Sequence, residues 1–335
     1  MTTDLQKDDS KPFKILSIDG GGVKGLYSST VIEHLEQRYG PISEYFDLLT
    51  GTSTGGLIAL CLAMKMPAVE VSAIYEKHGR KIFPRRRQFL GALRQALWRG
   101  KYSDKGLKKV LNQVFSEKTV GDLDNLVCIP SYSVTDARPW VFKRDHGILD
   151  RDNRTLLTDV ALATSAAPTY FPLSELAGYN NKQFIDGGVW ANNPTLVGII
   201  EALTYFVGAG KPFSSLEVLS ISSLNHSAGK PIGLTRHRSF WRWRNDLFDT
   251  SLIGQSYFTD YFVSQLCGLN DIKIRYVRVP SEEISAEQQH LVKLDGASRK
   301  SLQFIRGKGN DRGTVAKKDP EIAKYFKNKK MYKIN

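Results

Sequence analysis

The chain has 335 residues, of which 41% are hydrophobic and 24% are charged, and this composition excludes a disordered or fibrous protein. Its formal net charge of +13 favours a polyanionic partner, such as an anionic membrane, a nucleotide or a nucleic acid, and the alternative is a soluble basic protein without such a partner. The three cysteines show neither a metal-ligand spacing nor a disulfide framework, and no apolar run is long enough to span a bilayer. We therefore expect a cytoplasmic protein without a metal, which associates peripherally with the inner face of a membrane.

Strands and helices alternate along most of the sequence. After a polar tail at residues 1–12, the predicted elements are a strand at 13–19, helices at 23–39, 56–66 and 68–81, a basic insertion around 85–105, a helix at 107–115, strands at 126–129 and 140–142, a helix at 158–166, a strand at 183–186, a helix from Asn193, and strands at 216–222 and 272–279. This alternation predicts an α/β fold with a mostly parallel sheet and helices on both faces.

The most informative motif is a serine between glycines at a predicted strand-to-helix junction. Ser53 is flanked by Gly51 and Thr52 on one side and by Thr54 and Gly55 on the other. Such a turn is typical of a nucleophile elbow, which holds a serine hydroxyl at the start of a helix. The helix dipole at that point favours developing negative charge. The motif predicts a hydrolase that forms an acyl-enzyme on Ser53.

A serine nucleophile needs a base, and the sequence offers two kinds. Only His226 and His290 lie late enough for the usual chain order of a serine triad, and His226 is kept as a minor candidate. Asp186 ends a predicted strand and is followed by Gly187 and Gly188. Strand ends at one edge of a parallel sheet meet at one crevice, and burial would make an aspartate a better base. The alternative for Asp186 is a simple turn-forming Asp-Gly pair.

A glycine-rich loop follows the first predicted strand and opens a helix. Its backbone N–H groups would converge on one point and could stabilise an oxyanion; the loop consists of Gly20, Gly21, Gly22, Val23, Lys24 and Gly25. The same residues match the dinucleotide fingerprint. That alternative predicts an oxidoreductase with Glu44 or Asp47 on the ribose, but it leaves the serine elbow unexplained. Lys24 either adds positive charge to the loop or is solvated.

In this order, the motifs at residues 19–25, 51–56 and 186–188 resemble those of the patatin-like phospholipases, as do residues 163–171 and 191–194. The resemblance covers roughly residues 13–200. It implies a three-layer α/β/α sandwich, a Ser53–Asp186 dyad, an oxyanion hole around Gly21, Gly22 and Val23, and phospholipid esters as substrates. It implies no required cofactor. On this basis 13–200 is the expected catalytic core, 201–307 its C-terminal part, and 308–335 a solvated, lysine-rich tail.

The chain also resembles a compact bacterial subgroup, the antiphage (CBASS-type) phospholipases that a cyclic nucleotide switches on and that degrade the cell membrane. This resemblance implies a cyclic dinucleotide activator. The alternatives are a constitutive lipid acyl hydrolase without nucleotide control and a binding module without catalytic activity. We expect no nucleic acid partner.

A second ligand site is predicted where arginines alternate with aromatic residues. Arginine pairs with phosphate, and aromatic rings stack on bases or lie at a membrane interface; the candidate contacts are Arg236, Arg238, Trp241, Arg242, Trp243 and Arg244. The stretch could bind a cyclic nucleotide, dock on anionic lipid or form a homo-oligomer contact. The alternative is a solvated loop with incidental aromatic residues.

Overall fold

Eight strands form the central sheet of the protein, in a computed structural model that describes residues 12–84, 101–225, 233, 236–237, 240–268 and 273–333. The side chains of 240–242 and 244–246 are outside this description. So are the polar tail up to residue 11, residues 85–100 of the expected basic insertion, His226 and Arg238.

The sheet is mixed, with a parallel centre. Its order is β5-β6-β3-β2-β1-β7-β8, and β4 also pairs with β3. The strands are β1 (Phe13–Ile18), β2 (Leu48–Gly51), β3 (Leu126–Ser133), β4 (Arg138–Lys143), β5 (Ser174–Leu176), β6 (Lys182–Asp186), β7 (Ser215–Ile221) and β8 (Lys273–Val279). The pairs along β3-β2-β1-β7-β8 are parallel, whereas β4 and β6 run antiparallel to β3 and β5 antiparallel to β6. The strands β2 and β7 lie on opposite sides of β1, so the strand order changes direction beside β1. Ligand sites of α/β proteins form at such a switch point, next to the carboxyl ends of the strands.

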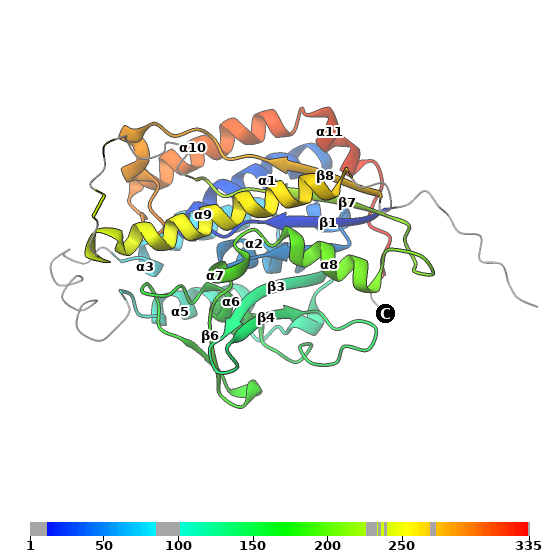
Figure 1. Ribbon diagram of the computed structural model, residues 1–335, viewed down its shortest axis with the longest axis horizontal. Coiled ribbons are helices and arrows are strands. Elements are labelled where there is room, and N and C mark those ends of the chain that lie inside the picture. The colour runs from blue at the N-terminus through cyan, green and yellow to red at the C-terminus, as the bar shows by residue number, and fades with distance from the viewer. Residues whose placement is uncertain are drawn as a thin grey trace, which may run out of the picture.

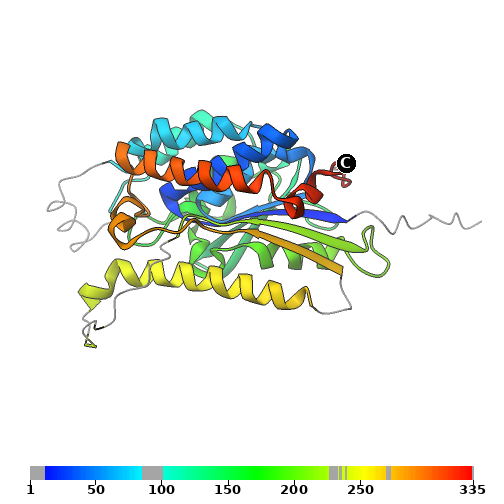
Figure 2. The same cartoon turned by 90° about the horizontal axis from the view of Figure 1, so that it is seen from above.

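Helices cover both faces of the sheet, which confirms the expected three-layer α/β/α sandwich (Figures 1 and 2). One layer contains α1 (Gly25–Tyr39), α2 (Thr54–Ala63), α3 (Ala68–Ile82), α5 (Lys105–Phe115), α6 (Leu157–Ser165) and α10 (Arg299–Ala316). The other contains α8 (Thr195–Tyr205) and α9 (Phe240–Leu266). The helices α7 (Gly188–Ala191) and α11 (Pro320–Ala323) are single turns.

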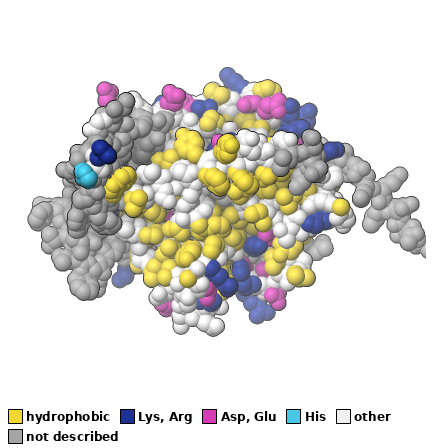
Figure 3. All heavy atoms as spheres, viewed as in Figure 1, with side chains coloured by type: hydrophobic (Ala, Val, Ile, Leu, Met, Phe, Trp, Pro, Cys, Tyr) yellow, Lys and Arg dark blue, Asp and Glu magenta, His cyan; other side chains and the backbone are white. Residues whose placement is uncertain are grey.

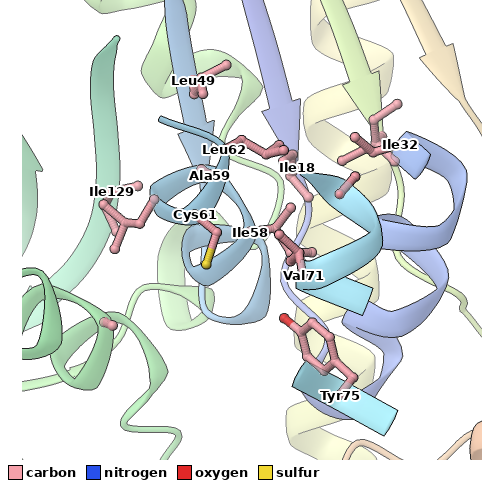
Figure 4. Packing of buried hydrophobic residues seen from close by; sticks show 14 of the residues in the cluster. Ile18, Ile32, Leu49, Ile58, Ala59, Cys61, Leu62, Val71, Tyr75 and Ile129 are labelled. Carbon is pink, nitrogen blue, oxygen red and sulfur yellow. The ribbon is translucent and has the colours of Figure 1, made fainter. Parts of the chain in front are cut away.

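The strand sequences explain why both faces are covered. Along β1, Phe13 and Ile15 pack into the cluster under α8 and α9, whereas Leu16 and Ile18 pack into the larger cluster on the opposite face. Successive side chains of a strand point to opposite faces, so a strand with apolar residues on both of its faces requires a layer on each side. Figure 4 shows part of the larger cluster, in which Ile58 of α2 lies next to residues of β1 and α3.

Two C-terminal segments differ from the sequence-based expectation. The sequence predicts a basic, aromatic segment from residue 236 and no helix there. The structure instead has helix α9, which begins at Phe240 and ends at Leu266. The idea of a solvated tail from residue 308 is wrong for most of its length. Residues 308–316 belong to α10, which packs on α1, and Tyr325 is fully buried with its hydroxyl donating to the Val218 carbonyl at 2.9 Å.

Candidate active site

Ser53 occupies a strained turn between β2 and α2. Its φ of 54° and ψ of −122° are backbone angles that non-glycine residues rarely adopt, at a cost of about 1–3 kcal/mol. A Cβ atom at Gly51 would meet the backbone of Gly55, and one at Gly55 would meet the carbonyl of Ile18. The turn therefore approaches the sheet too closely for any other residue at these two positions. A strained serine turn between a strand and a helix is the backbone geometry that a nucleophile elbow requires.

Hydrogen bonds from three directions fix this turn. The Ser53 N–H donates to the Thr164 hydroxyl of α6 at 2.9 Å, and that hydroxyl donates in turn to a carbonyl of β3. The Thr52 hydroxyl donates to a carbonyl of α7 at 2.6 Å. The hydroxyls of Thr54 and Tyr75 lie 2.5 Å apart. Because α2, α3, α6 and α7 all contribute, the strained angles of Ser53 are set by the surrounding structure.

Asp186, at the end of β6, interacts with Ser53. The residue is 4% exposed, and its carboxylate accepts a hydrogen bond from the Gly188 N–H at 2.7 Å. Burial raises the pKa of Asp186 to about 6, and the neighbouring Ser53 hydroxyl and the Gly188 N–H oppose that rise only in part. A carboxylate with this pKa accepts a proton far better than an exposed aspartate and remains ionised at neutral pH.

The route by which Asp186 reaches Ser53 differs from the one expected. We expected two strand ends at the same edge of a parallel sheet, but β6 is antiparallel to β3. Asp186 pairs with Ser131 near the C-terminal end of β3, and β2 pairs with β3 so that Thr50 lies opposite Cys128. Ser131 therefore lies just beyond the end of β2, where Ser53 follows that strand. The two residues meet at the carboxyl edge of β2 and β3, although β6 itself enters that edge as an antiparallel strand.

The glycine loop after β1 has fewer free donors than the sequence suggested. Most of its backbone N–H groups have acceptors: Gly20 donates to the Asn192 carbonyl, Val23 to the Leu294 carbonyl at 2.8 Å, Lys24 to Gly21, and Gly25 to Gly22 and Val23. In the described part of the chain, the N–H groups of Gly21 and Gly22 have no acceptor, and both residues line the same pocket as Ser53 and Asp186. An oxyanion hole in this loop would therefore use Gly21 and Gly22, because the Val23 amide is already engaged.

A buried ion pair holds Asp19, the residue that precedes this loop, against β8. Asp19, fully buried, forms two hydrogen bonds with the Arg278 guanidinium of β8, at 2.5 and 3.2 Å. Arg278 also donates to the Ser220 hydroxyl at 2.6 Å. Burial raises the pKa of Asp19, while Arg278 and the Ser256 hydroxyl of α9 lower it. Sequence patterns did not identify Arg278, because a single arginine in a strand carries no motif.

A narrow apolar pocket of about 70 Å³ lies beside Ser53 and Asp186, and an apolar lining with a few polar groups is typical of ligand sites. Tyr170 and Phe171, from the motif at 163–171, belong to its lining. The lining also includes residues that no sequence motif predicted, chiefly Leu57, Ile82, Phe83, Leu107, Phe248, Leu252 and Leu294. Such a lining fits a hydrocarbon chain, because burial of apolar surface favours binding without the need for a polar partner.

The other predicted contacts lie apart from this pocket or outside the description. Lys24 is buried rather than solvated, and burial lowers its pKa. Arg236 is exposed, and Trp243 is 38% exposed in the first turn of α9. Arg238 lies outside the described residues, as do the side chains of Trp241, Arg242 and Arg244.

In the residues that the structure describes, no three histidine, cysteine or acidic side chains are grouped as a metal site would require. Over the same residues, no helix combines the length and the apolar character needed to cross a membrane.

Comparison with known proteins agrees with this geometry. Residues 16–199 match the family described as "Patatin-like phospholipase". A "cGAMP-activated phospholipase" of Pseudomonas aeruginosa is 35% identical over 92% of this chain and 90% of its own length, and one of Escherichia coli is 30% identical over 93% and 92%. The crystal structure of VipD from Legionella pneumophila aligns with a TM-score of 0.42 at 14% identity, covering 89% of this chain and 68% of VipD.

These findings identify a lipid ester hydrolase with an α/β fold. The chain belongs to the patatin-like phospholipase family. The alternative of a dinucleotide-dependent oxidoreductase is not supported. Asp47, one of its two candidate ribose ligands, is buried and accepts the backbone N–H groups of Lys14, Met331 and Tyr332.

Proposed function

We propose that the protein is a phospholipase of the A type, which hydrolyses carboxylic esters of membrane phospholipids with Ser53 as nucleophile and Asp186 as base. The observation that carries this proposal is that the Ser53 hydroxyl lies beside a buried carboxylate, that of Asp186, whose pKa is raised to about 6. Both groups line an apolar pocket. In the first step the Ser53 hydroxyl oxygen attacks the ester carbonyl, and its proton passes to Asp186.

The negative oxygen of the tetrahedral intermediate would accept hydrogen bonds from the Gly21 and Gly22 N–H groups. Such donors are worth ~10²–10³ in rate each, because they are already oriented before charge develops. Collapse of the intermediate breaks the ester bond, and Asp186 returns the proton to the departing lysophospholipid oxygen. Water then attacks the acyl-Ser53 ester and gives a proton to Asp186. Collapse of this second intermediate breaks the bond between the acyl carbon and the Ser53 oxygen, Asp186 returns the proton to that oxygen, and the fatty acid is released.

We also propose that a cyclic dinucleotide activates the protein and that the activated protein acts in antiphage defence. Two relatives that align over nearly the whole chain carry the name cGAMP-activated phospholipase. The net charge of +13 suits both an anionic nucleotide and the anionic inner face of a cell membrane. Arg236 and Trp243, with Arg238, Trp241, Arg242 and Arg244, remain candidate contacts for either ligand.

Purified protein mixed with phospholipid liposomes, with and without cGAMP, tests the proposal. We expect release of fatty acid to rise on addition of cGAMP and to vanish in Ser53→Ala. Ser264→Ala, which changes an exposed serine on α9, is the matched control and should keep the native rate. Hydrolysis at full rate without nucleotide would support the constitutive alternative, and hydrolysis that survives Ser53→Ala would refute the assigned nucleophile. Nucleotide or lipid binding without any turnover would favour the non-catalytic alternative.

A further inference from the structure

The solvent-facing side of α9 carries no charge over most of its length. From Leu247 to Leu266 the helix has only two charged residues, Asp249 and Asp260, and both are partly buried. The exposed positions recur every three or four residues and so lie on one side of the helix. We call this side the outer face of α9; it comprises Leu247, Thr250, Ser251, Gly254, Tyr257, Phe258, Tyr261, Phe262, Ser264 and Gln265.

Large apolar side chains on this outer face are exposed to an unusual degree. Tyr257 is 64% exposed, Phe258 62% and Tyr261 66%. Ile200 of the neighbouring α8, 62% exposed, lies on the same side of the sheet. Figure 3 shows hydrophobic side chains running across this side of the molecule, over α9 and α8. Contiguous exposed apolar surface of this kind marks a contact surface.

The area of the outer face matches one half of a stable dimer interface. Leu247 is 54% exposed and Phe262 40%. With about 200 Å² for a whole large side chain, the exposed fractions of these two, the three aromatic residues above and Ile200 give roughly 600–700 Å² for one copy. Two copies would bury roughly 1,300 Å², within the range of specific protein–protein interfaces. Depletion of charge and enrichment in aromatic residues are also typical of the centre of such interfaces. An anionic bilayer would instead be recognised by lysine or arginine beside the aromatic rings, and the outer face has neither.

The order of large and small residues on the outer face is complementary to itself. Gly254 lies midway between the large residues at 247 and 261, and a Cβ atom there would meet nothing within 4 Å. If two copies of α9 cross antiparallel at Gly254, Tyr261 lies opposite Leu247, while Phe258 lies opposite Thr250. A two-fold axis makes each such contact twice. We propose that the outer face of α9 is a homodimer interface, in which two α9 helices pack antiparallel with Gly254 at the two-fold axis.

This interface would lie on the helix that also closes the active-site pocket. The inner side of α9 contributes Phe248 and Leu252 to the pocket lining. It also holds Asn192, whose side chain donates to the Ser256 hydroxyl at 2.9 Å. A second copy on the outer face would therefore contact the same rigid element that borders the acyl site.

Sedimentation velocity of the full chain tests the dimer. We expect the native protein to sediment as a dimer and the double variant Phe258→Lys/Tyr261→Lys to sediment as a monomer at the same concentration. Each buried, unpaired charge should raise the dissociation constant at least about tenfold. Ile148→Lys is the matched control, since Ile148 is 88% exposed on a loop after β4, and it should leave the dimer intact. A native protein that stays monomeric, or a double variant that stays dimeric, overturns the proposal. A monomer that binds vesicles through Phe258 and Tyr261 assigns the face to lipid and overturns it too.

A cysteine placed at the axis tests the antiparallel arrangement independently of charge. In a Cys267→Ser background, Gly254→Cys should form a disulfide-linked dimer on mild oxidation, because packed helices approach closely enough at such a point for disulfide formation. Gln265→Cys is the control on the same face. In the antiparallel dimer its two copies would lie roughly 30 Å apart, so it should remain monomeric on a non-reducing gel. Linkage through Gln265→Cys but not through Gly254→Cys would overturn the arrangement.

Discussion

Replacement of Asp186 by asparagine separates the proposed base from its structural role. Asparagine keeps the size of the side chain and the oxygen that accepts the Gly188 N–H, but it cannot take up the Ser53 proton. General-base catalysis typically contributes ~10²–10⁴ in rate. We therefore expect kcat for phospholipid hydrolysis by Asp186→Asn to fall by about that factor, with a much smaller change in KM, because the apolar pocket remains.

The pH dependence follows from the pKa of about 6 at Asp186. Only the ionised carboxylate can accept a proton, so native activity should rise with pH through 6 and level off above it. One unit below the pKa, about a tenth of the base is ionised, which predicts a roughly tenfold lower rate at that pH. The residual rate of Asp186→Asn should not follow this curve.

Stability should change in the opposite direction to activity. The pKa of Asp186 is raised from 3.8 in the unfolded chain to about 6 in the native protein, so the native state binds the proton more tightly. That contribution to stability is complete below the unfolded pKa and is lost as pH rises through the native pKa. A shift of about two units corresponds to about 3 kcal/mol. Asp186→Asn removes this penalty, so its free energy of unfolding should exceed that of the native protein by up to this amount at pH 8 and by little at pH 4.

Liposome hydrolysis across pH and urea unfolding at both pH values measure these effects together. Asp150→Asn, an exposed change on the loop after β4, is the matched control and should alter neither quantity. An Asp186→Asn enzyme with native kcat and a native pH profile would refute the assignment of the base. A variant that loses both activity and stability would show that Asp186 is structural.

Three further substitutions probe the residues around the pair. Gly22→Ala places a methyl group against a backbone oxygen in a left-handed turn, and kcat should drop at least about tenfold because one oxyanion donor shifts; an unchanged rate in the liposome assay would contradict the role of this loop. Arg278→Met leaves Asp19 buried without its cation, which should cost about 3–5 kcal/mol of unfolding free energy at pH 8 and less in acid, where the carboxyl is protonated; equal urea midpoints for variant and native protein would refute this. Thr164→Val removes the acceptor of the Ser53 N–H and should lower stability by about 1–3 kcal/mol, whereas a thermal unfolding midpoint equal to that of Thr164→Ser would show that the bond contributes nothing.

Local sequence patterns were sufficient for the elbow and for the alternation of strands and helices. Glycine on both sides of Ser53 reflects a close approach that only glycine permits, and the apolar run of β1 reflects burial on both faces. These are constraints that neighbouring residues impose on each other, so the sequence displays them directly. The same patterns could not identify α9, because its outer face carries aromatic residues where a solvated helix carries charges.

Contacts between distant parts of the chain were decided only by the tertiary structure. The sequence by itself determined the α/β class and the strained serine turn, and it favoured Asp186 over a histidine as the proposed base. It could not determine that Asp186 lies beside Ser53 at the end of an antiparallel strand. Nor could it determine that the Leu294 carbonyl accepts the Val23 N–H, or that Arg278 pairs with Asp19, more than 250 residues away in the sequence. Such contacts depend on sheet register and on which loops meet at a strand end, and no local pattern records either.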